Sequence, residues 1–307
     1  MIRLKLAGAL AAAALVTSGC AAFNGLGSVD LSQTVTQSYQ LGPFNLAAMD
    51  EPGFESNSTQ NNIPRPAGVL GIKAMSFDIV DSDGVPVSKH DVHLHHVLLM
   101  NDGRDDLLCP GRDERFSGAG AERTAIDLWS DYAYMVGAND QWDALWHIMN
   151  ESETARTVYI KYTISYIPGL TAQTGRAVTP YFQDVNGCGG STFDVPGNGG
   201  PGSVFTKSRT WTAPVSGVAI FTGAHMHEGG IDQTLLKVFN GQVACTSVVS
   251  YHEDPRHVAT ISPCKLHHKV VAGQKYRLTS RYENSAPLDN VMGINITYVW
   301  HGTPPPA

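Results

Sequence analysis

Hydrophobic and polar residues alternate in short runs along most of this chain. The clearest run is Arg156–Ile167, where large apolar or aromatic residues occupy every second position. Because successive side chains of a strand point to opposite faces, this pattern predicts a strand with one buried face. Similar runs predict further strands at Gly68–Val80, Val92–Met100, Trp142–Met149, Val218–Phe221, Thr234–Phe239, Lys275–Tyr282 and Val291–Trp300. No segment shows a helical stripe longer than about two turns, so we expect an all-β sandwich fold.

The segments between these runs indicate how the strands are connected and how they are divided into domains. Asn240-Gly241 is a strong hairpin signal. The stretch Asn101–Arg123 is rich in Asp, Gly and Arg, which predicts a long surface loop. Gly187–Gly202 contains seven glycines and two prolines, which is typical of a linker. We therefore expect an N-terminal domain at 35–186, a Gly-rich linker at 187–203 and a C-terminal domain at 204–303.

The N-terminus resembles a targeting segment. Arg3 and Lys5 precede an apolar run that is too short to span a bilayer, followed by small residues and Cys20. Residues 1–20 are therefore predicted to be an export signal. Thr17-Ser18-Gly19-Cys20 resembles a lipobox, in which Cys20 would be lipidated and would anchor the chain to a membrane; ordinary cleavage after Ala21 is the alternative. Residues 21–34 are small and polar and read as a flexible tether.

Four further cysteines fit an oxidising, extracytoplasmic location. They are Cys109, Cys188, Cys245 and Cys264, an even number that predicts two disulfides. Three pairings are open, and proximity favours Cys245 with Cys264. No C-x₂-C element is present, which argues against a four-cysteine metal site.

The net charge narrows the class of partner. The chain carries −7 at pH 7, and no run of Lys or Arg forms a basic stripe. Nucleic-acid binding depends on such positive charge, so a nucleic-acid partner is not expected. A small-molecule substrate is the expected partner.

Histidines provide the candidate chemistry. In Thr222–Gly230, read TGAHMHEGG, His225 and His227 are two residues apart after an apolar run. In a strand these two side chains project from the same face, and paired imidazoles suit zinc, copper, iron or nickel.

A second cluster, KHDVHLHHVLL, contains His90, His93, His95 and His96. Adjacent His95 and His96 would point to opposite faces of a regular strand, so joint ligation requires a strand end or a bulge. Taken singly, these residues also fit a strand with exposed histidines. His147 and Met292 lie in apolar runs and, taken alone, fit a core.

Together these residues match a family motif by motif. The chain resembles the copper type II, ascorbate-dependent monooxygenases, the group of peptidylglycine α-hydroxylating monooxygenase and dopamine β-hydroxylase. The family's H-H-M-L-L motif is similar to His95-His96-Val97-Leu98-Leu99 of this chain. The family's H-T-H motif is similar to His225-Met226-His227. The family's third histidine and its methionine ligand resemble His147 and Met292. The resemblance implies two tandem jelly-roll-like domains with one copper each, His₃ in the first and His₂Met in the second.

A closer resemblance covers about Tyr39 to Trp300. The chain is similar to the plant stress up-regulated Nod 19 proteins, a family without a settled activity. The shared landmarks are LGPF at Leu41–Phe44, LHH at Leu94–His96, GAGAERT at Gly118–Thr124, AHMHEGG at Ala224–Gly230, VMG at Val291–Gly293, and the cysteines Cys245 and Cys264.

Three departures from the peptide-amidating enzymes affect the expected substrate. Gly223 stands where those enzymes have an arginine that holds the substrate carboxylate, and Ile296 replaces a substrate-binding tyrosine. Leu145 replaces a glutamine near the third histidine. Without the bidentate arginine clamp, peptide amidation is not expected.

The resulting hypothesis is an exported copper monooxygenase-like protein that hydroxylates a C–H bond of a small substrate with O₂ and a reductant such as ascorbate. A His₂Met set suits Cu(I), and a His₃ set suits copper that cycles between oxidation states. One alternative is a non-catalytic extracytoplasmic copper-binding protein; another is a β-sandwich ligand-binding module with vestigial sites. Zinc with His₃ and water is the alternative metal, and would permit hydrolysis.

Overall fold

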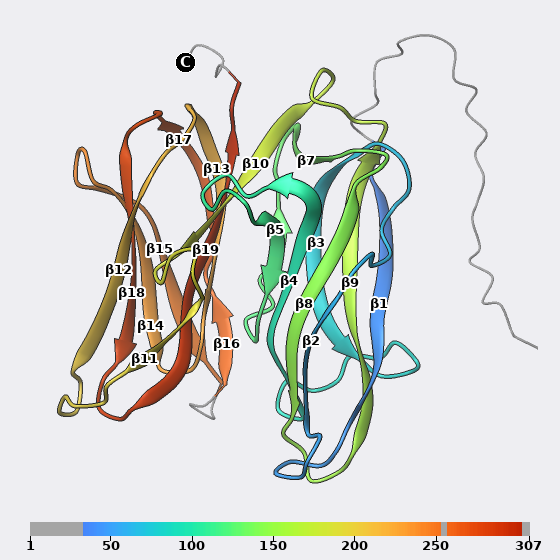
Figure 1. Cartoon of the computed structure of the whole chain (residues 1–307), viewed down its shortest axis with the longest axis vertical. Coiled ribbons are helices and arrows are strands. Elements are labelled where there is room, and N and C mark those ends of the chain that lie inside the picture. Colours follow the sequence, from blue (N-terminus) through green and yellow to red (C-terminus); the bar gives the residue numbers. More distant parts are fainter. Residues whose placement is uncertain (1–32, 253–256, 303–307) are drawn as a thin grey trace, which may run out of the picture.

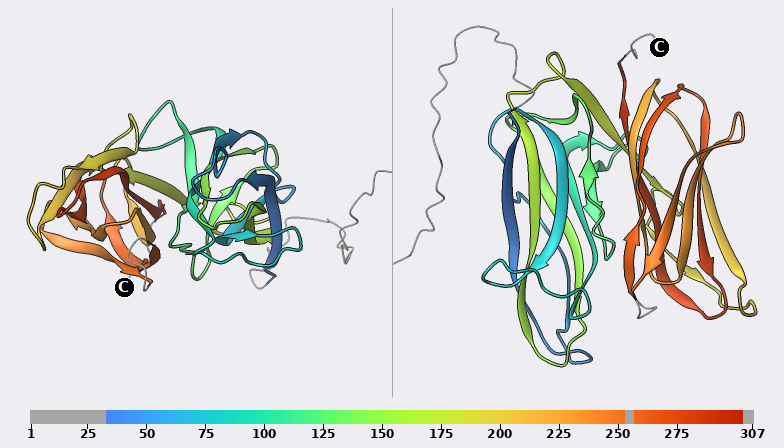
Figure 2. Two further views of the ribbon diagram at one scale, coloured as in Figure 1. Left: turned by 90° about the horizontal axis from the view of Figure 1, so that it is seen from below. Right: turned by 180° about the vertical axis from the view of Figure 1, so that it is seen from behind.

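The computed structural model describes residues 33–252 and 257–302, and these residues form two β-sandwiches side by side (Figures 1 and 2). Every regular element in the described residues is a strand, so the all-β prediction is confirmed. Residues 1–32, with the expected signal, Cys20 and most of the expected tether, lie outside the described residues. Within the described ranges, no helix has the length and apolar character needed to cross a membrane.

The N-terminal sandwich packs two sheets face to face. One sheet has the order β1-β9-β3-β7, with β6 added beside β3, and the other has the order β2-β8-β4-β5. The strands are β1 (Val35–Leu46), β2 (Glu55–Gln60), β3 (Leu70–Val80), β4 (Val92–Asp105), β5 (Asp113–Ala119), β6 (Ile126–Asp127), β7 (Tyr132–Val136), β8 (Gln141–Asn150) and β9 (Arg156–Pro168). The alternating run predicted from Arg156 is β9, whose apolar positions are buried as expected.

The C-terminal sandwich has the same two-layer design. Its sheets have the orders β10-β19-β13-β17, with β11 beside β19, and β12-β18-β14-β15-β16. The strands are β10 (Arg176–Asp184), β11 (Thr192–Val195), β12 (Val204–Thr212), β13 (Gly217–Met226), β14 (Gly230–Lys237), β15 (Gln242–Tyr251), β16 (Val258–Ile261), β17 (Cys264–Val270), β18 (Lys275–Glu283) and β19 (Leu288–Trp300).

Strand β10 connects the two sandwiches. It pairs antiparallel with β19 and, at Arg176–Val178, parallel with β7, so one sheet runs through both halves. The predicted linker at 187–203 contains β11, which also pairs with β19 and buries Phe193 and Val195. Residues of the predicted linker therefore pack against the C-terminal sandwich. The position of the boundary between the two domains stays a prediction.

The predicted loop at Asn101–Arg123 is wrong in part. β4 extends to Asp105, and β5 follows, with Phe116 and Ser117 buried. Its charged residues are compatible with a strand because they are paired: Arg115 Nε lies 2.8 Å from Asp106 Oδ2, and Tyr134 donates to Glu114 Oε2 over 2.6 Å. Buried charges are tolerated when they are paired in this way.

Two disulfides are present. Cys245 pairs with Cys264, as proximity suggested, and Cys109 pairs with Cys188. The second bond ties the loop between β4 and β5 to the segment after β10. These bonds indicate an oxidising environment.

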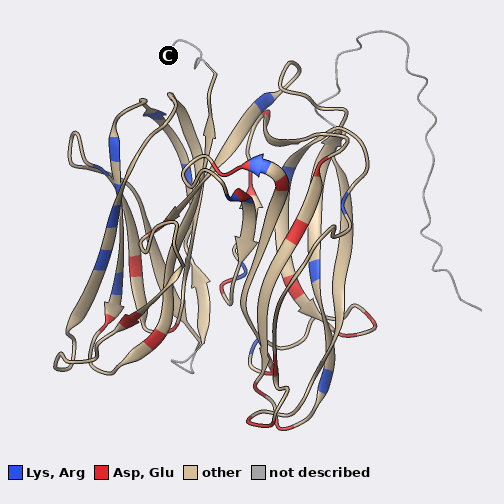
Figure 3. Ribbon diagram, viewed as in Figure 1, with Lys and Arg blue, Asp and Glu red and all other residues tan. Residues whose placement is uncertain are grey.

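Lys and Arg are interspersed with Asp and Glu over both sandwiches (Figure 3).

Candidate metal centre

A bulge in β4 brings two adjacent histidines together. Leu94 pairs with Ile148 of β8 and His96 pairs with His147, so His95 is the extra residue between them. The Nδ1 atoms of His95 and His96 lie 3.1 Å apart. A bulge re-aims a side chain in this way. The bulge that two adjacent histidines need in order to bind one ion together is therefore present.

His147 completes this first set from the neighbouring strand. Its ring centroid lies 4.6 Å from that of His95, and one ligand atom from each of His95, His96 and His147 lies within 4.8 Å of the others. His147 Nε2 donates to Glu55 Oε2 over 2.9 Å, which leaves its other ring nitrogen available. A carboxylate that holds the outer nitrogen of a ligating histidine is a common feature of metal sites.

The environment keeps the imidazoles of His95 and His96 neutral. Burial, reinforced by the neighbouring histidines, lowers the pKa of His95 to about 2 and that of His96 to about 3. A histidine must be unprotonated to bind a metal ion. Both rings are therefore in ligand form at neutral pH.

His225 and His227 come from the end of β13 in the other sandwich. Their ring centroids are 5.1 Å apart, and the Nε2 atom of each is buried without a hydrogen-bond partner. Buried polar atoms are rarely left unpaired, so two such nitrogens side by side suggest a missing ligand. Burial lowers the pKa of His227, and His225 and the other nearby histidines lower it further.

Glu122 holds His225 in place. The Nδ1–H of His225 faces Glu122, with Nδ1 3.2 Å from Oε2, and Glu122 also accepts the N–H of Gly120 over 2.7 Å. Burial alone would raise the pKa of Glu122, but His225 and the backbone bonds outweigh it and lower the pKa. The carboxylate orients His225 with Nε2 free, whereas Glu55 holds Nε2 of His147 and leaves Nδ1 of that ring free.

The two histidine sets touch. The ring centroids of His95 and His227 are 4.1 Å apart, closer than those of His225 and His227. The expectation was one copper site in each domain. The structure instead places all five histidines in one continuous cluster where the sandwiches meet.

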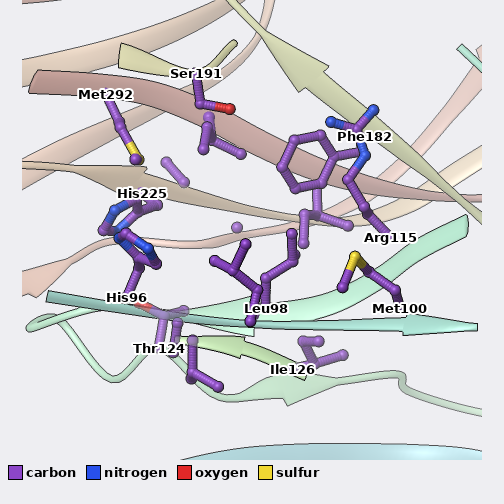
Figure 4. A pocket seen from close by; sticks show the side chains of 18 of the residues that line it. His96, Leu98, Met100, Arg115, Thr124, Ile126, Phe182, Ser191, His225 and Met292 are labelled. Atoms are coloured by element: carbon purple, nitrogen blue, oxygen red, sulfur yellow. The ribbon is translucent and has the colours of Figure 1, made fainter. Parts of the chain in front are cut away.

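Met292 lies on β19, beside β13. His225 pairs with Ile294 in the ladder, so Met292 is two positions along on the same face, within diagonal reach of a long side chain. Its side chain points toward His225 (Figure 4), and both residues line the same cavity. Tyr282 supports this corner, because it accepts the N–H of His227 over 3.1 Å and donates to the carbonyl of Met292.

A cavity of about 360 Å³ lies between the sandwiches, directly beside these candidate ligands (Figure 4). His96, His225 and Met292 form part of its wall. The other walls are mostly apolar and include Leu98, Met100, Ile126, Leu145, Phe182, Phe221, Gly223, Ile294, Ile296 and Tyr298. The three positions that depart from the peptide-amidating enzymes, Leu145, Gly223 and Ile296, are all among them.

Two arginines line the cavity, the exposed Arg112 and the buried Arg115. Arg115 pairs with Asp106 and stacks over the ring of Phe182 at 3.9 Å. A guanidinium already paired and stacked is a weaker partner for a substrate carboxylate than a free one. The cavity therefore suits a substrate that is largely apolar.

Several residues of this site were not identified from the sequence. Glu55 lies in no motif, whereas Glu122 belongs to the landmark GAGAERT at Gly118–Thr124, which is the signal that indicates it. His93, Glu228 and His257 form a further group that could hold a metal ion. His257 is not part of any recognised motif, so the sequence did not indicate it as a candidate metal ligand.

Fold and site together define an all-β protein of two sandwiches with a histidine-rich centre between them. The sequence model of the family Stress up-regulated Nod 19 matches residues 191–301. This match supports the resemblance to that family for the part with His225, His227 and Met292; His95, His96 and His147 lie outside it.

The remaining comparisons add little. No curated protein matches the chain. Among solved structures, the "Crystal Structure of the STIV MCP" is 11% identical, with 88% of this chain and 97% of that chain covered and a TM-score of 0.36. A likeness at this level supports no conclusion about this chain.

Proposed function

We propose that this chain is an exported, copper-dependent monooxygenase that hydroxylates a C–H bond of a small, largely apolar substrate with O₂ and a reductant such as ascorbate. The observation that carries the proposal is the position of the cavity, which is bordered directly by His96, His225 and Met292. A protein that only stores metal has no need of an apolar chamber of about 360 Å³ against the ligands.

The donor atoms fit copper. The unpartnered Nε2 atoms of His225 and His227, with the thioether of Met292, would hold one ion, and His95, His96 and His147 another. Imidazole with thioether favours copper, particularly Cu(I), over zinc. When bound, copper would supply the one-electron and O₂ chemistry by which one oxygen atom enters the substrate and the other is reduced to water.

The chain itself contributes binding, orientation and exclusion of water. Leu98, Ile296 and Tyr298 would hold an apolar substrate against the ligand wall. Glu122 and Glu55 fix the tautomers of His225 and His147. The buried, apolar surroundings keep bulk water from the reacting atoms.

A copper-binding protein without turnover is the second candidate. Its supporting observation is the contact between His95 and His227, because that contact joins the two histidine sets into one cluster that would hold copper without any substrate. This candidate predicts tight copper binding without substrate-dependent consumption of O₂.

The substitution Met292→Leu separates the two candidates, because it removes the thioether and retains an apolar side chain of similar size. We expect copper-loaded wild type to consume O₂ in the presence of ascorbate and a panel of small apolar compounds, and Met292→Leu to lose at least about 90% of that rate. An oxygen electrode with product analysis measures this; Met49→Leu, at an exposed position, is the control.

Equal O₂ consumption by wild type and Met292→Leu contradicts the monooxygenase proposal. The absence of substrate-dependent consumption in wild type, with copper still bound, supports the second candidate.

A further inference from the structure

Next to the copper ligands lies a separate group of metal-binding side chains. One ligand atom from each of His93, Glu228 and His257 lies within 4.8 Å of the others. His93 Nε2 is 3.8 Å from Glu228 Oε1, and the rings of His93 and His257 are 5.8 Å apart. Neither histidine belongs to the His₃ or His₂Met set.

These residues come from both sandwiches. His93 is on β4 of the N-terminal sandwich. Glu228 follows β13, and His257 precedes β16, the strand at the side of the C-terminal sandwich that faces the N-terminal one (Figure 1). Both histidines are buried, with 6% and 4% of their surface exposed, whereas Glu228 is half-buried. An ion held here would bind the two sandwiches to each other.

A further carboxylate stands behind His257. Glu151 Oε2 lies 3.0 Å from His257 Nε2, and the backbone N–H of Glu151 donates to the carbonyl of Asp91 over 2.8 Å. A carboxylate in this position orients a ligating histidine and increases its basicity.

We propose that His93, His257 and Glu228 form a zinc site that joins the two sandwiches, with Glu151 as the carboxylate that orients His257. Two histidines and one carboxylate are a known zinc ligand set, in which water takes the fourth position. The absence of a thioether or thiolate from this group favours zinc over Cu(I). The site has a structural role: it holds the walls of the cavity at a fixed separation.

Zinc content tests the proposal. The metal-free protein is incubated with Zn²⁺ and desalted, its zinc is measured by mass spectrometry, and its unfolding temperature is recorded with and without Zn²⁺. We expect His257→Gln and Glu228→Gln each to retain one zinc fewer than wild type and to show a smaller rise in unfolding temperature. The control is His267→Gln, an exposed position on β17, which should behave as wild type.

Gln at 257 can still donate to Glu151, which helps the variant to fold. A second measurement needs no variant: anomalous scattering at the zinc edge from crystals of the zinc-loaded wild type should show an ion between His93 and His257. Wild-type zinc content in both variants, or no anomalous peak between these residues, overturns the proposal.

The test is independent of the proposed monooxygenase activity. The variant His96→Ala should lose copper at the neighbouring set and still retain the zinc at His93 and His257. Loss of this zinc in His96→Ala would contradict the existence of a separate site.

Discussion

Gly120 shows how closely the histidine cluster is packed. A Cβ at this position would lie 2.8 Å from the carbonyl oxygen of His95, and closer still to the ring of His225. Real Cβ atoms do not approach other atoms so closely, so only glycine fits between the two histidine sets. The Gly-rich landmark at Gly118–Thr124 therefore has a physical reason: its backbone passes between His95 and His225, and it supplies Glu122.

We predict that Gly120→Ala displaces His225 and weakens copper binding about 10-fold or more, an effect like that of losing an orienting partner of a metal ligand. Competition with a chromophoric Cu(I) chelator measures the affinity. Gly200→Ala is the matched control, because a Cβ at that exposed position meets nothing within 4 Å. Unchanged affinity in Gly120→Ala would show that His225 is not a ligand.

Among the elements, β4 and β9 could be predicted from the sequence and β5 could not. Alternation identified β9, and two adjacent histidines required the irregularity that the bulge at His95 provides. β5 was missed because Asp113, Glu114 and Arg115 resemble a loop. Arg115 pairs with Asp106, and Glu114 accepts a hydrogen bond from Tyr134; partners outside the strand leave no local signal.

The end of β10 carries a testable electrostatic feature. Asp184 is fully buried, and burial raises its pKa to about 6 although Ser191, the N–H of Asn186 and two arginines favour the charged form. In the unfolded chain an aspartate has a pKa of about 3.9. Since the folded value is the higher, this group favours the folded state below about pH 4, and the contribution is lost as pH rises through about 6.

The predicted loss amounts to about 2 kcal/mol between pH 4 and pH 8. We expect Asp184→Asn to remove this pH dependence and to be at least as stable as wild type at pH 8. Urea unfolding of both proteins at the two pH values measures it, with the exposed Asp83→Asn as control. The same pH dependence in wild type and Asp184→Asn would refute the assignment.

At the scale of the whole molecule, the relative position of the two sandwiches could not be read from the sequence. The candidate ligands and their order were predicted from the motifs, but the motifs gave no indication that His95 and His227 touch. That contact depends on β10 pairing with both β7 and β19, on the Cys109–Cys188 bond and on the Tyr298 hydroxyl, which donates to the carbonyl of Phe116. All of these join residues far apart in the chain.

The cavity between the sandwiches can be tested by filling it. A Cβ on Gly223 would make only ordinary contacts, the nearest 3.5 Å away at Phe221, so alanine fits. The larger side chain of Gly223→Phe would project into the chamber. We predict that it lowers the affinity for an apolar fluorescent dye at least about 10-fold, whereas Gly223→Ala binds as wild type. Equal dye binding in all three proteins would show that the chamber is not the binding site.

The most direct test of the account is the copper content of the protein. Wild type is loaded with Cu(I) under reducing conditions, dialysed, and analysed for metal, beside the double variant His225→Ala/His227→Ala and the exposed control His267→Ala. We predict about two copper ions per chain in wild type and in the control, and about one in the double variant. Less than one ion per chain in wild type would contradict the claim that this histidine cluster is a copper centre.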